Sequence, residues 1–519
     1  MDKSQKTIIG KDVIESLTLG MYEDSRFIFR EYIQNSADQI DKSVNLGFLP
    51  SRDAGEIWIH IDKDERKISI EDNATGIKAD EVVKILRNIA QSHKKRGVDK
   101  GFRGIGRLGG LGYCDRLTFE TSYHGENVKS TMIWDAKELK NIINNRSKKE
   151  EAAEVIDKVT EFVTEEETAD KKYFKVTLEN VTNDILLDKH AIREYLQMVA
   201  PVPFHPRFIF KTMIAEELEK NNLSIDEYKI YVNTDQIFKA YTTSIYAGDE
   251  RYKKKFDEIY EIRFFKFDKE PGEVLAWGWY GISNFEKEIP KRGNLARGLR
   301  LRSGNIQIGS EYCLVKLHKE PRGNFYFFGE VHAFHGDLIP NARRDYFLEN
   351  DTTKLFEKEL RKFFKDELYK LYYFASKVRG QQKRITQLID FKKEYEKKSQ
   401  HGFTNKEEIK KYEEKFEKLK EAAEEAKKEL KKIVIDLKDS DTPKKGVLER
   451  LTNGQPSEVD TIELPNNQGN EKPKFLTDEL TKLSKRDRKL LSRVFAVIDR
   501  VLPKELAENL KLKIKEEFE

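Results

Sequence analysis

The segment FREYIQNSADQID, residues 29–41, places three polar side chains on one face of a predicted helix. At 100° per residue, Glu31, Asn35 and Asp38 cluster together. The apolar stripe of the same helix lies roughly 170° away and consists of Phe29, Ile33 and Ile40. One face is therefore suited to a core, and the other presents a carboxylate, an amide and a second carboxylate. Taken alone, this pattern is typical of an ordinary amphipathic helix with a solvated face.

A second segment, KISIEDNATG at residues 67–76, ends a predicted strand at Asp72 and then turns. A carboxylate at a strand end can point into a pocket and accept a proton from an exocyclic amine. Gly76 has no Cβ, so the backbone there can approach a flat ring closely. Alone, this D-x-x-x-G spacing is only a turn signal.

A third segment, GFRGIG at residues 101–106, is followed by three more glycines. A glycine-rich segment that runs into a helix start groups several backbone N–H donors, which suits phosphate. A dinucleotide-binding loop would need a strand directly before it, but a helix and the basic linker HKKRGVDK precede it here. A protein-kinase loop is excluded because no H-R-D or D-F-G motif follows.

In this order and at these separations, the three segments resemble the GHKL ATPases. This superfamily contains gyrase, the heat-shock protein 90 chaperones, histidine kinases and MutL. EYIQNSAD resembles the N-box, DNATG the D-x-G-x-G box and GFRGIG the lid loop, whose GFRG is similar to that of MutL. Residues 14–41, together with IAQS before the lid, resemble the chaperone branch.

The resemblance implies that the ligand is ATP with Mg²⁺. Glu31 would orient and deprotonate the attacking water, and Asn35 would hold Mg²⁺ against the phosphates. Asp72 would bind the adenine amino group, and Gly76 would line the base. The other residues expected beside the nucleotide are Asp38 and, in the lid, Gly101, Arg103, Gly104, Ile105 and Gly106.

Two positions depart from the family pattern. Ala74 stands where the family has the first glycine of D-x-G-x-G, and its methyl group could tighten the base pocket. Phe174 stands where the family often has a threonine that contacts the base through water. Thr177 is nearby, and that role stays unassigned.

The segment FYFFGEVHAFHGDLIPNARRDYF resembles the part of the chaperone middle domain that ends in N-x-S-R-E. Arg344 then matches the arginine that reaches the γ-phosphate, and its permanent charge and rigid fork suit that task. The alternative is a surface arginine pair beside a loop. Upstream, Arg297, Arg300 and Arg302 alternate along a predicted strand. They either contact phosphate, a partner or nucleic acid, or belong to a salt-bridged sheet surface.

Alternating helix and strand patterns predict the scaffold for these motifs. EIWIHID and KISIED alternate with a period of two and predict a β-hairpin. The predicted fold class is α+β: a GHKL (Bergerat) ATPase sandwich at 1–190, then an α+β middle or transducer domain at 191–351. A long helical coiled-coil hairpin at 352–438, a flexible linker at 439–474 and a C-terminal helical segment at 475–519 complete the expected organisation.

The hairpin prediction rests on four heptads that run from Ile409 to Leu437. Thr404 and Glu407 fit a capping box at the start of that helix. The alternative is a solvated helix packed on its own domain. Further along, Ser484 with Asp487 predicts another helix start, and Pro503 opens the final helix.

Composition narrows the class of protein. The chain has 519 residues, a hydrophobic fraction of 38%, a charged fraction of 36% and a net charge of only +4. Its two cysteines, Cys114 and Cys313, show no metal-binding spacing and favour a reducing compartment. The sequence has neither a signal peptide pattern nor an apolar run long enough for a membrane span, so we expect a cytoplasmic location.

These features together predict an ATPase with slow turnover that works as a chaperone-like, ATP-gated clamp on protein partners. Two copies would join through the C-terminal helices as a homodimer. The alternative is a monomer. Resemblance to components of bacterial phage-defence loci suggests a setting in defence. The alternative is a clamp on DNA, similar to MutL or MORC. The near-neutral charge does not favour nucleic acid.

Overall fold

The computed structural model describes residues 8–18, 24–89, 106–147, 149–248, 252–438, 442–452, 474–478 and 480–518. These residues divide into two compact units. The first contains the chain up to Tyr369 except 284–286, and the second contains those three residues and everything from Lys370 onward. None of the described helices combines the length and the hydropathy that crossing a bilayer requires.

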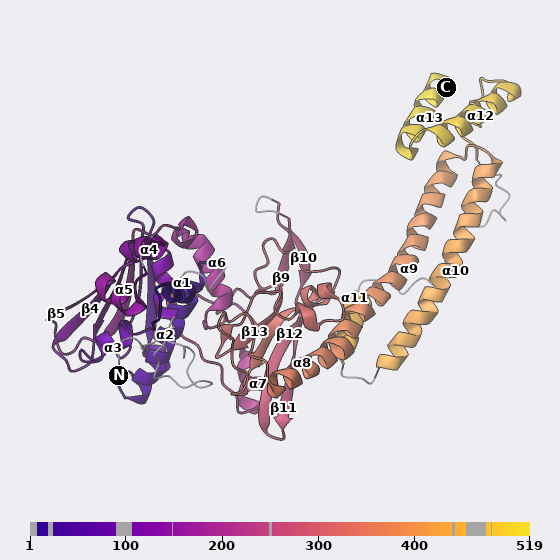
Figure 1. Cartoon of the computed structure of the whole chain (residues 1–519). Helices are drawn as coiled ribbons and strands as arrows, with labels where there is room; N and C mark the ends of the chain where they lie inside the picture. Colours follow the sequence, from indigo (N-terminus) through magenta and orange to yellow (C-terminus); the bar gives the residue numbers. More distant parts are fainter. Residues whose placement is uncertain are drawn as a thin grey trace. The chain divides into compact units, whose positions relative to one another are not determined.

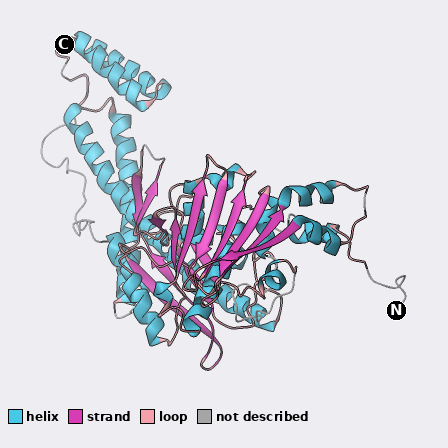
Figure 2. Cartoon of the chain, turned by 90° about the vertical axis from the view of Figure 1, so that its left-hand side faces the viewer, coloured by secondary structure: helices cyan, strands magenta, loops and turns pink. Residues whose placement is uncertain are grey.

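The first unit begins with an eight-stranded mixed sheet, whose strands lie side by side in Figure 2. Its order is β5 (Thr160–Glu166), β4 (Val128–Asp135), β3 (Arg116–Ser122), β6 (Tyr173–Glu179), β2 (Lys67–Asp72), β1 (Glu56–Asp62), β7 (Lys229–Val232) and β8 (Asp235–Gln236). The predicted hairpin of β1 and β2 is confirmed, with Ile59 opposite Ile70. Alternate residues of both strands are buried, as a period of two requires.

Six helices also contribute to this core. They are α1 (Asp12–Thr18), α2 (Phe27–Asn45), α3 (Val82–Leu86), α4 (Ala136–Asn144), α5 (Ala152–Val159) and α6 (Lys189–Val199). The predicted apolar stripe of α2, Phe29, Ile33 and Ile40, is fully buried against the sheet. The helix expected at 79–92 is shorter, because α3 ends at Leu86 and residues 90–92 lie outside the described residues.

The first sheet extends beyond the boundary expected at residue 190. Strand β7 falls within the range 191–351 expected for the middle domain, but it pairs in parallel with β1. The outer edge of β1 has unpaired backbone groups that the β1–β2 hairpin cannot satisfy, so a later segment of the chain completes the ladder. Strand pairing therefore carries this sheet to Gln236.

The remainder of the first unit is a second α+β region. Its five-stranded sheet has the order β11 (Glu261–Glu270), β12 (Glu273–Ile282), β15 (Phe328–Ala333), β13 (Gly298–Ser303) and β14 (Ile306–Gln307). A separate pair is formed by β9 (Ser244–Ala247) and β10 (Lys254–Glu258), and α7 (Lys211–Lys220) packs in the same aromatic-rich core. The region continues into α8 (Asp351–Phe363) and a single π-helical segment, Phe364–Tyr369.

The second unit is helical (Figure 1). It contains α9 (Lys370–His401), α10 (Lys406–Leu437), α11 (Pro443–Thr452), α12 (Lys485–Val501) and α13 (Lys504–Phe518). The long helices α9 and α10 pack along one another through a cluster that includes Leu388, Phe391, Phe416, Ala423 and Ala426. Ser484 caps α12 by accepting from the Asp487 N–H, as predicted.

Two details of this unit differ from expectation. The cap of α10 is Asn405, whose side chain accepts from the Glu408 N–H, one residue after the predicted box. Asn405 takes the extended conformation that a capping side chain needs. Within the expected flexible linker, residues 443–452 form α11, because tertiary packing buries Val447 and Leu448.

Candidate functional site

Helix α2 carries the acidic residue at the centre of the site. Glu31 lies in its second turn and is only 7% exposed. Asn35 and Asp38, from the same predicted polar face, are half-buried. The structure thus keeps the three side chains on the expected helix, but it buries the first of them more than a solvated face would allow.

The Glu31 carboxylate lies between two arginines. Its Oε1 atom is 3.6 Å from Arg30 Nη2 and 3.6 Å from Arg344 Nε, and it accepts no hydrogen bond from the described residues. Arg344 comes from the second α+β region and has a φ of +54°, in the left-handed region. The Gly309 N–H donates to the Arg344 carbonyl at 2.8 Å, which holds the loop in place.

The end of the predicted lid touches the same carboxylate. A Cβ added at Gly106 would lie 2.2 Å from Glu31 Oε2, so a larger residue would displace the carboxylate. Gly106 begins a 3₁₀ segment, Gly106–Gly112. The other predicted lid residues, Gly101, Arg103, Gly104 and Ile105, lie outside the described residues.

Asp72 ends β2 in a fully buried position. Its Oδ1 atom accepts from the Ala74 N–H at 3.1 Å, and Ser36 of α2 also hydrogen-bonds the carboxyl. The Oδ2 atom has no hydrogen-bond partner among the described residues. Burial raises the pKa of Asp72 to about 7, against the lowering effect of those two hydrogen bonds. A buried acceptor with an unused oxygen fits recognition of an amino group.

Gly76 is fixed by both its conformation and its surroundings. Its φ is +67°, and a Cβ there would lie 1.9 Å from the Ser122 carbonyl oxygen. The backbone therefore approaches β3 closely enough to exclude any other residue. Ala74 is fully buried in the core of the domain. Phe174 lies directly opposite Asp72 on β6 and stacks on Phe119.

Several neighbours of the site were not identified from the sequence. Arg30 pairs with Glu31, Ser36 bonds Asp72, and Lys172 donates to the Asn73 carbonyl at 2.8 Å. Arg30 and Ser36 are adjacent in sequence to residues that were identified. No spacing rule marks them, because their contacts depend on how α2 lies against β2 and on the loop at Arg344.

The alternating arginines of β13 belong to a buried, salt-bridged arrangement. Arg302 is fully buried, and its Nε lies 2.5 Å from Glu330 Oε1 on β15. Lys239 Nζ lies 2.8 Å from the other oxygen of Glu330. Arg300 is 4% exposed and lies 3.6 Å from Glu311. Of the two interpretations of this arginine row, a ligand contact or a salt-bridged sheet, the salt-bridged sheet therefore applies to Arg302.

Comparison with known proteins agrees with this geometry. The family described as histidine kinase-, DNA gyrase B- and HSP90-like ATPase matches residues 24–166. The chaperone protein HtpG of Coxiella burnetii (strain RSA 331 / Henzerling II) is 28% identical over 195 residues, which cover 34% of this chain and 30% of the relative. HtpG of Methylibium petroleiphilum is 29% identical over 146 residues, or 24% of this chain and 23% of the relative.

The matched part thus spans less than a third of the length of these relatives. The family match covers α2, β1 and β2, and therefore Glu31, Asp72 and Gly76 with their surroundings. Residues 24–166 are therefore an ATPase domain of the GHKL superfamily, and the chain is similar to the HtpG chaperones over about a third of its length.

Proposed function

We propose that this protein binds ATP with Mg²⁺ and hydrolyses it slowly. The observation that carries the proposal is the position of Glu31, buried between Arg30 and Arg344 and in contact with the end of the glycine-rich segment. Asp72 is linked through Ser36 to the same helix, five residues further on. At about 1.5 Å per residue, these five residues span roughly 7.5 Å of α2. The carboxylates of Glu31 on α2 and Asp72 at the end of β2 can then face two parts of one extended nucleotide.

Each residue has a chemical task in this proposal. Asp72 accepts the adenine amino group with its unused Oδ2. Glu31 orients a water molecule and takes its proton, while Arg344 and Arg30 stabilise charge that develops on the phosphate. Mg²⁺, held with the help of Asn35, would neutralise the phosphates. Glu31 would also have to exchange its arginine contacts for contact with the water.

The test of this activity compares wild-type protein with Glu31→Ala. Calorimetry with ATP and Mg²⁺ should give similar affinities for both, while steady-state hydrolysis falls by about a hundredfold or more in the variant. Glu15→Ala, an exposed residue of α1, is the matched control and should hydrolyse ATP normally. Unchanged turnover in Glu31→Ala would remove this residue from the mechanism.

At the level of the whole protein, we propose a chaperone-like clamp that acts on protein partners as a homodimer. Support comes from the similarity to HtpG and from the position of Arg344, which a second α+β region supplies to the ATPase domain. ATP that attracts Arg344 would hold the two regions together, and hydrolysis would release them. Cross-linking of Glu31→Ala in cell extracts, with and without ATP, should then capture protein partners only with ATP.

Sedimentation of the full chain with ATP distinguishes the dimer from the monomer. The alternative clamp on DNA predicts binding that weakens steeply as salt rises. The burial of Arg300 and Arg302 removes one candidate surface for it. The proposed setting in phage defence predicts fewer plaques on a bacterial host that expresses the wild-type protein than on one that expresses Glu31→Ala.

A further inference from the structure

Helix α12 presents an exposed apolar stripe. The stripe consists of Leu490, Val494, Val497 and Val501, which are 42–69% exposed. At 100° per residue, the four side chains lie within roughly 60° of one another. Phe495, which is buried, lies roughly 130° from the centre of the stripe. The helix therefore has two apolar faces, one of which is packed and one of which is open to solvent.

The opposite face of α12 is held against the rest of its unit. Ser492 Oγ lies 3.3 Å from Thr477 Oγ1, and Lys511 Nζ donates to Asp499 Oδ1 at 2.5 Å. Thr404 Oγ1 donates to the other oxygen of Asp499 at 3.2 Å. Ser492 and Asp499 lie roughly 170° from the centre of the stripe. These contacts fix the rotation of α12 about its own axis, so the stripe faces outward.

A row of basic side chains borders the stripe on one side. Arg486, Arg493 and Arg500 recur every seven residues, and Lys489 lies beside them. At 100° per residue, this basic row lies roughly 50–110° from the centre of the stripe. All four side chains are exposed, and none of them forms an ion pair with a residue that the structure describes. The stripe and the basic row together form one docking surface with a positive edge.

The acidic residues of α12 do not neutralise the basic row. The helix contains only two of them, Asp487 and Asp499, against six basic residues. Asp487 accepts from the Ser484 hydroxyl at 2.6 Å in the helix cap, and Asp499 pairs with Lys511. Both carboxylates are therefore engaged away from the row, which keeps its positive charge.

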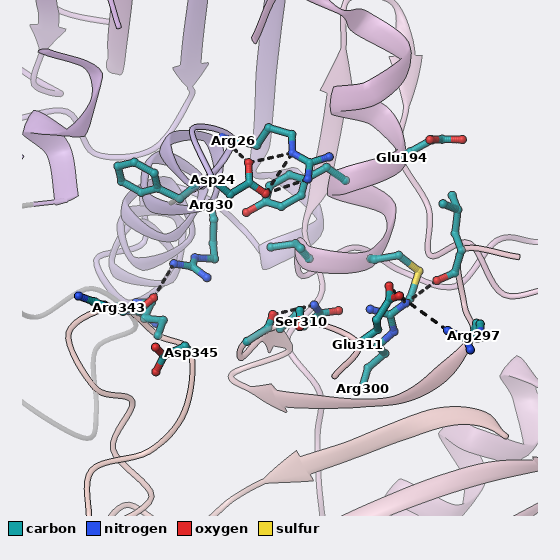
Figure 3. Close-up of a pocket in the computed structure, with 18 of the residues that line it drawn as sticks. Asp24, Arg26, Arg30, Glu194, Arg297, Arg300, Ser310, Glu311, Arg343 and Asp345 are labelled. Carbon is teal, nitrogen blue, oxygen red and sulfur yellow. Dashed lines mark hydrogen bonds and ion pairs between the residues drawn. The ribbon is translucent and has the colours of Figure 1, made fainter. Parts of the chain in front are cut away.

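The arginines of the cavity in Figure 3 offer no comparable surface. This cavity of about 510 Å³ is lined in part by α6 and β13. Arg26 pairs with Asp24 at 2.8 Å, and Arg297 and Arg300 lie 3.9 Å and 3.6 Å from the Glu311 carboxylate. These cations already have carboxylates beside them, whereas the basic row of α12 has none.

The spacing of the stripe fits a helical partner. Its residues follow one another at intervals of four, three and four positions, as in the seam of a coiled coil. They span roughly 16 Å of helix. A second copy of α12 does not complete this seam well, because antiparallel pairing would bring the two basic rows together. In a parallel pair, each row would meet the packed side of the other helix, so the proposed homodimer would use another surface.

Other classes of partner fit less well. Nucleic acid would contact the basic row through its phosphates and leave the apolar stripe uncovered. Helices that lie on membranes carry bulky Trp, Phe and Leu side chains, whereas three of the four stripe residues are valines. Valine packs well in helix–helix seams. A partner helix that has carboxylates beside its own apolar stripe complements both parts of the surface.

We propose that α12 docks an acidic amphipathic helix of a partner protein. The apolar residues of that helix lie along the stripe from Leu490 to Val501, and its carboxylates lie along the basic row. Such docking gives the proposed clamp its class of protein partner, and it rests on that proposed function for its biological role. The binding itself uses α12 and needs no ATP.

The test is fluorescence anisotropy of a labelled synthetic helix titrated with the full chain in the absence of nucleotide. The probe is about four heptads long, with leucine at positions a and d and glutamate at e and g. Two matched peptides carry glutamine or lysine at e and g. The glutamate peptide should bind at least about tenfold more tightly than the glutamine peptide, and the lysine peptide should not bind. Equal affinities, or no binding of the glutamate peptide at about 1 mM, would overturn the proposal.

Variants on exposed positions of α12 locate the surface. Arg493→Glu should weaken the glutamate peptide by at least about tenfold and allow the lysine peptide to bind. Val497→Asp should weaken the glutamate and glutamine peptides by about tenfold or more. Lys485→Glu makes the same charge reversal roughly 150° from the stripe and should change affinity by less than about threefold. Equal losses in Arg493→Glu and Lys485→Glu would refute the assignment.

Two further measurements exclude other occupants. Vesicles of phosphatidylserine and phosphatidylcholine should not displace the glutamate peptide, and displacement that Arg493→Glu abolishes would assign the surface to membranes instead. Sedimentation should give the same oligomeric state for wild type and Val497→Asp, and dissociation of a dimer by the variant would assign the stripe to a second copy. Glu31→Ala should bind the glutamate peptide as wild type does, so a failure of ATP hydrolysis and a failure of docking are distinguishable.

Discussion

Replacing Asp72 by asparagine should stabilise the unliganded protein while it removes ATP binding. The reason lies in the burial of this carboxyl group, which is 1% exposed and has one oxygen without a partner. A site that is prepared to accept an amino group keeps an unfavourable charge when the ligand is absent. Asparagine has nearly the same shape and carries no charge, so it removes that penalty.

The size of the effect follows from the pKa of Asp72, which burial raises from its ordinary 3.8 to about 7. A difference of about 3 pKa units corresponds to about 4 kcal/mol between the charged and neutral forms. At pH 8, Asp72→Asn should therefore raise the free energy of unfolding by up to about 4 kcal/mol. Rearrangement around the new amide would reduce this gain.

The same pKa also defines how the stabilising effect of Asp72→Asn changes with pH. Because the folded pKa lies above the unfolded one, the neutral acid favours the folded state, and that advantage is lost as pH rises from about 4 to about 7. The stabilising effect of Asp72→Asn should thus be about 2 kcal/mol larger at pH 8 than at pH 5.5. Above about pH 7, the stabilising effect of Asp72→Asn should stay nearly constant.

The assay is urea unfolding of the full chain at both pH values, with calorimetry of ATP binding on the same samples. The variant should lose ATP affinity by about a hundredfold or more, because its amide N–H₂ would face the adenine amino group. Wild-type affinity should fall about tenfold from pH 7.5 to pH 6, as the ionised fraction of Asp72 decreases.

Glu71→Gln is the control, since this half-exposed neighbour pairs with Lys175 at 3.3 Å on the surface. It should change stability by less than about 1 kcal/mol and leave ATP binding intact. If Asp72→Asn were destabilising at pH 8, or if its effect were the same at both pH values, the reasoning about a buried ionised carboxylate would be wrong. Normal ATP affinity in the variant would refute the adenine contact.

Three further substitutions test other parts of the structure. Arg344→Lys should lower ATP hydrolysis by about a hundredfold, because lysine lacks the rigid guanidinium fork of arginine. An equal loss in Arg343→Lys, at the exposed neighbour, would contradict a specific role for Arg344. Gly106→Ala should lower hydrolysis by about tenfold to a hundredfold, since its Cβ would displace Glu31, and unchanged turnover would refute that contact. Glu330→Gln should lower the free energy of unfolding by about 3–5 kcal/mol, because it weakens the buried pairs with Lys239 and Arg302. Glu288→Gln, at a partly exposed ion pair, should lower it by less than about 1 kcal/mol. Urea unfolding measures both.

Local patterns in the sequence account for much of the fold. The alternation of Ile57, Ile59 and Ile61 predicts a strand with one buried face, and the structure has it. The stripe on α2 and the cap at Ser484 are equally local, because each depends on neighbours within one or two turns. The motifs around Glu31 and Asp72 differ from these, because only their order and separation along the chain resemble the GHKL ATPases.

Contacts between distant segments were decided only by the tertiary structure. Strand β7 extends the first sheet because β1 has an open edge. The sequence of β7 does not indicate which strand it pairs with. Arg302 is buried because Glu330 on β15 neutralises it, although an alternating arginine row is equally typical of a surface. Helix α11 forms where the composition predicts a linker, because packing buries Val447 and Leu448.

The sequence by itself determined which side chains could do chemistry and the elements that carry them, because helix and strand periodicity act over a few residues. The tertiary structure decided their environment: the two arginines around Glu31 and the burial that raises the pKa of Asp72. Burial and charge pairing depend on residues that are far apart in the chain, such as Glu31 and Arg344. No local pattern specifies how such segments meet.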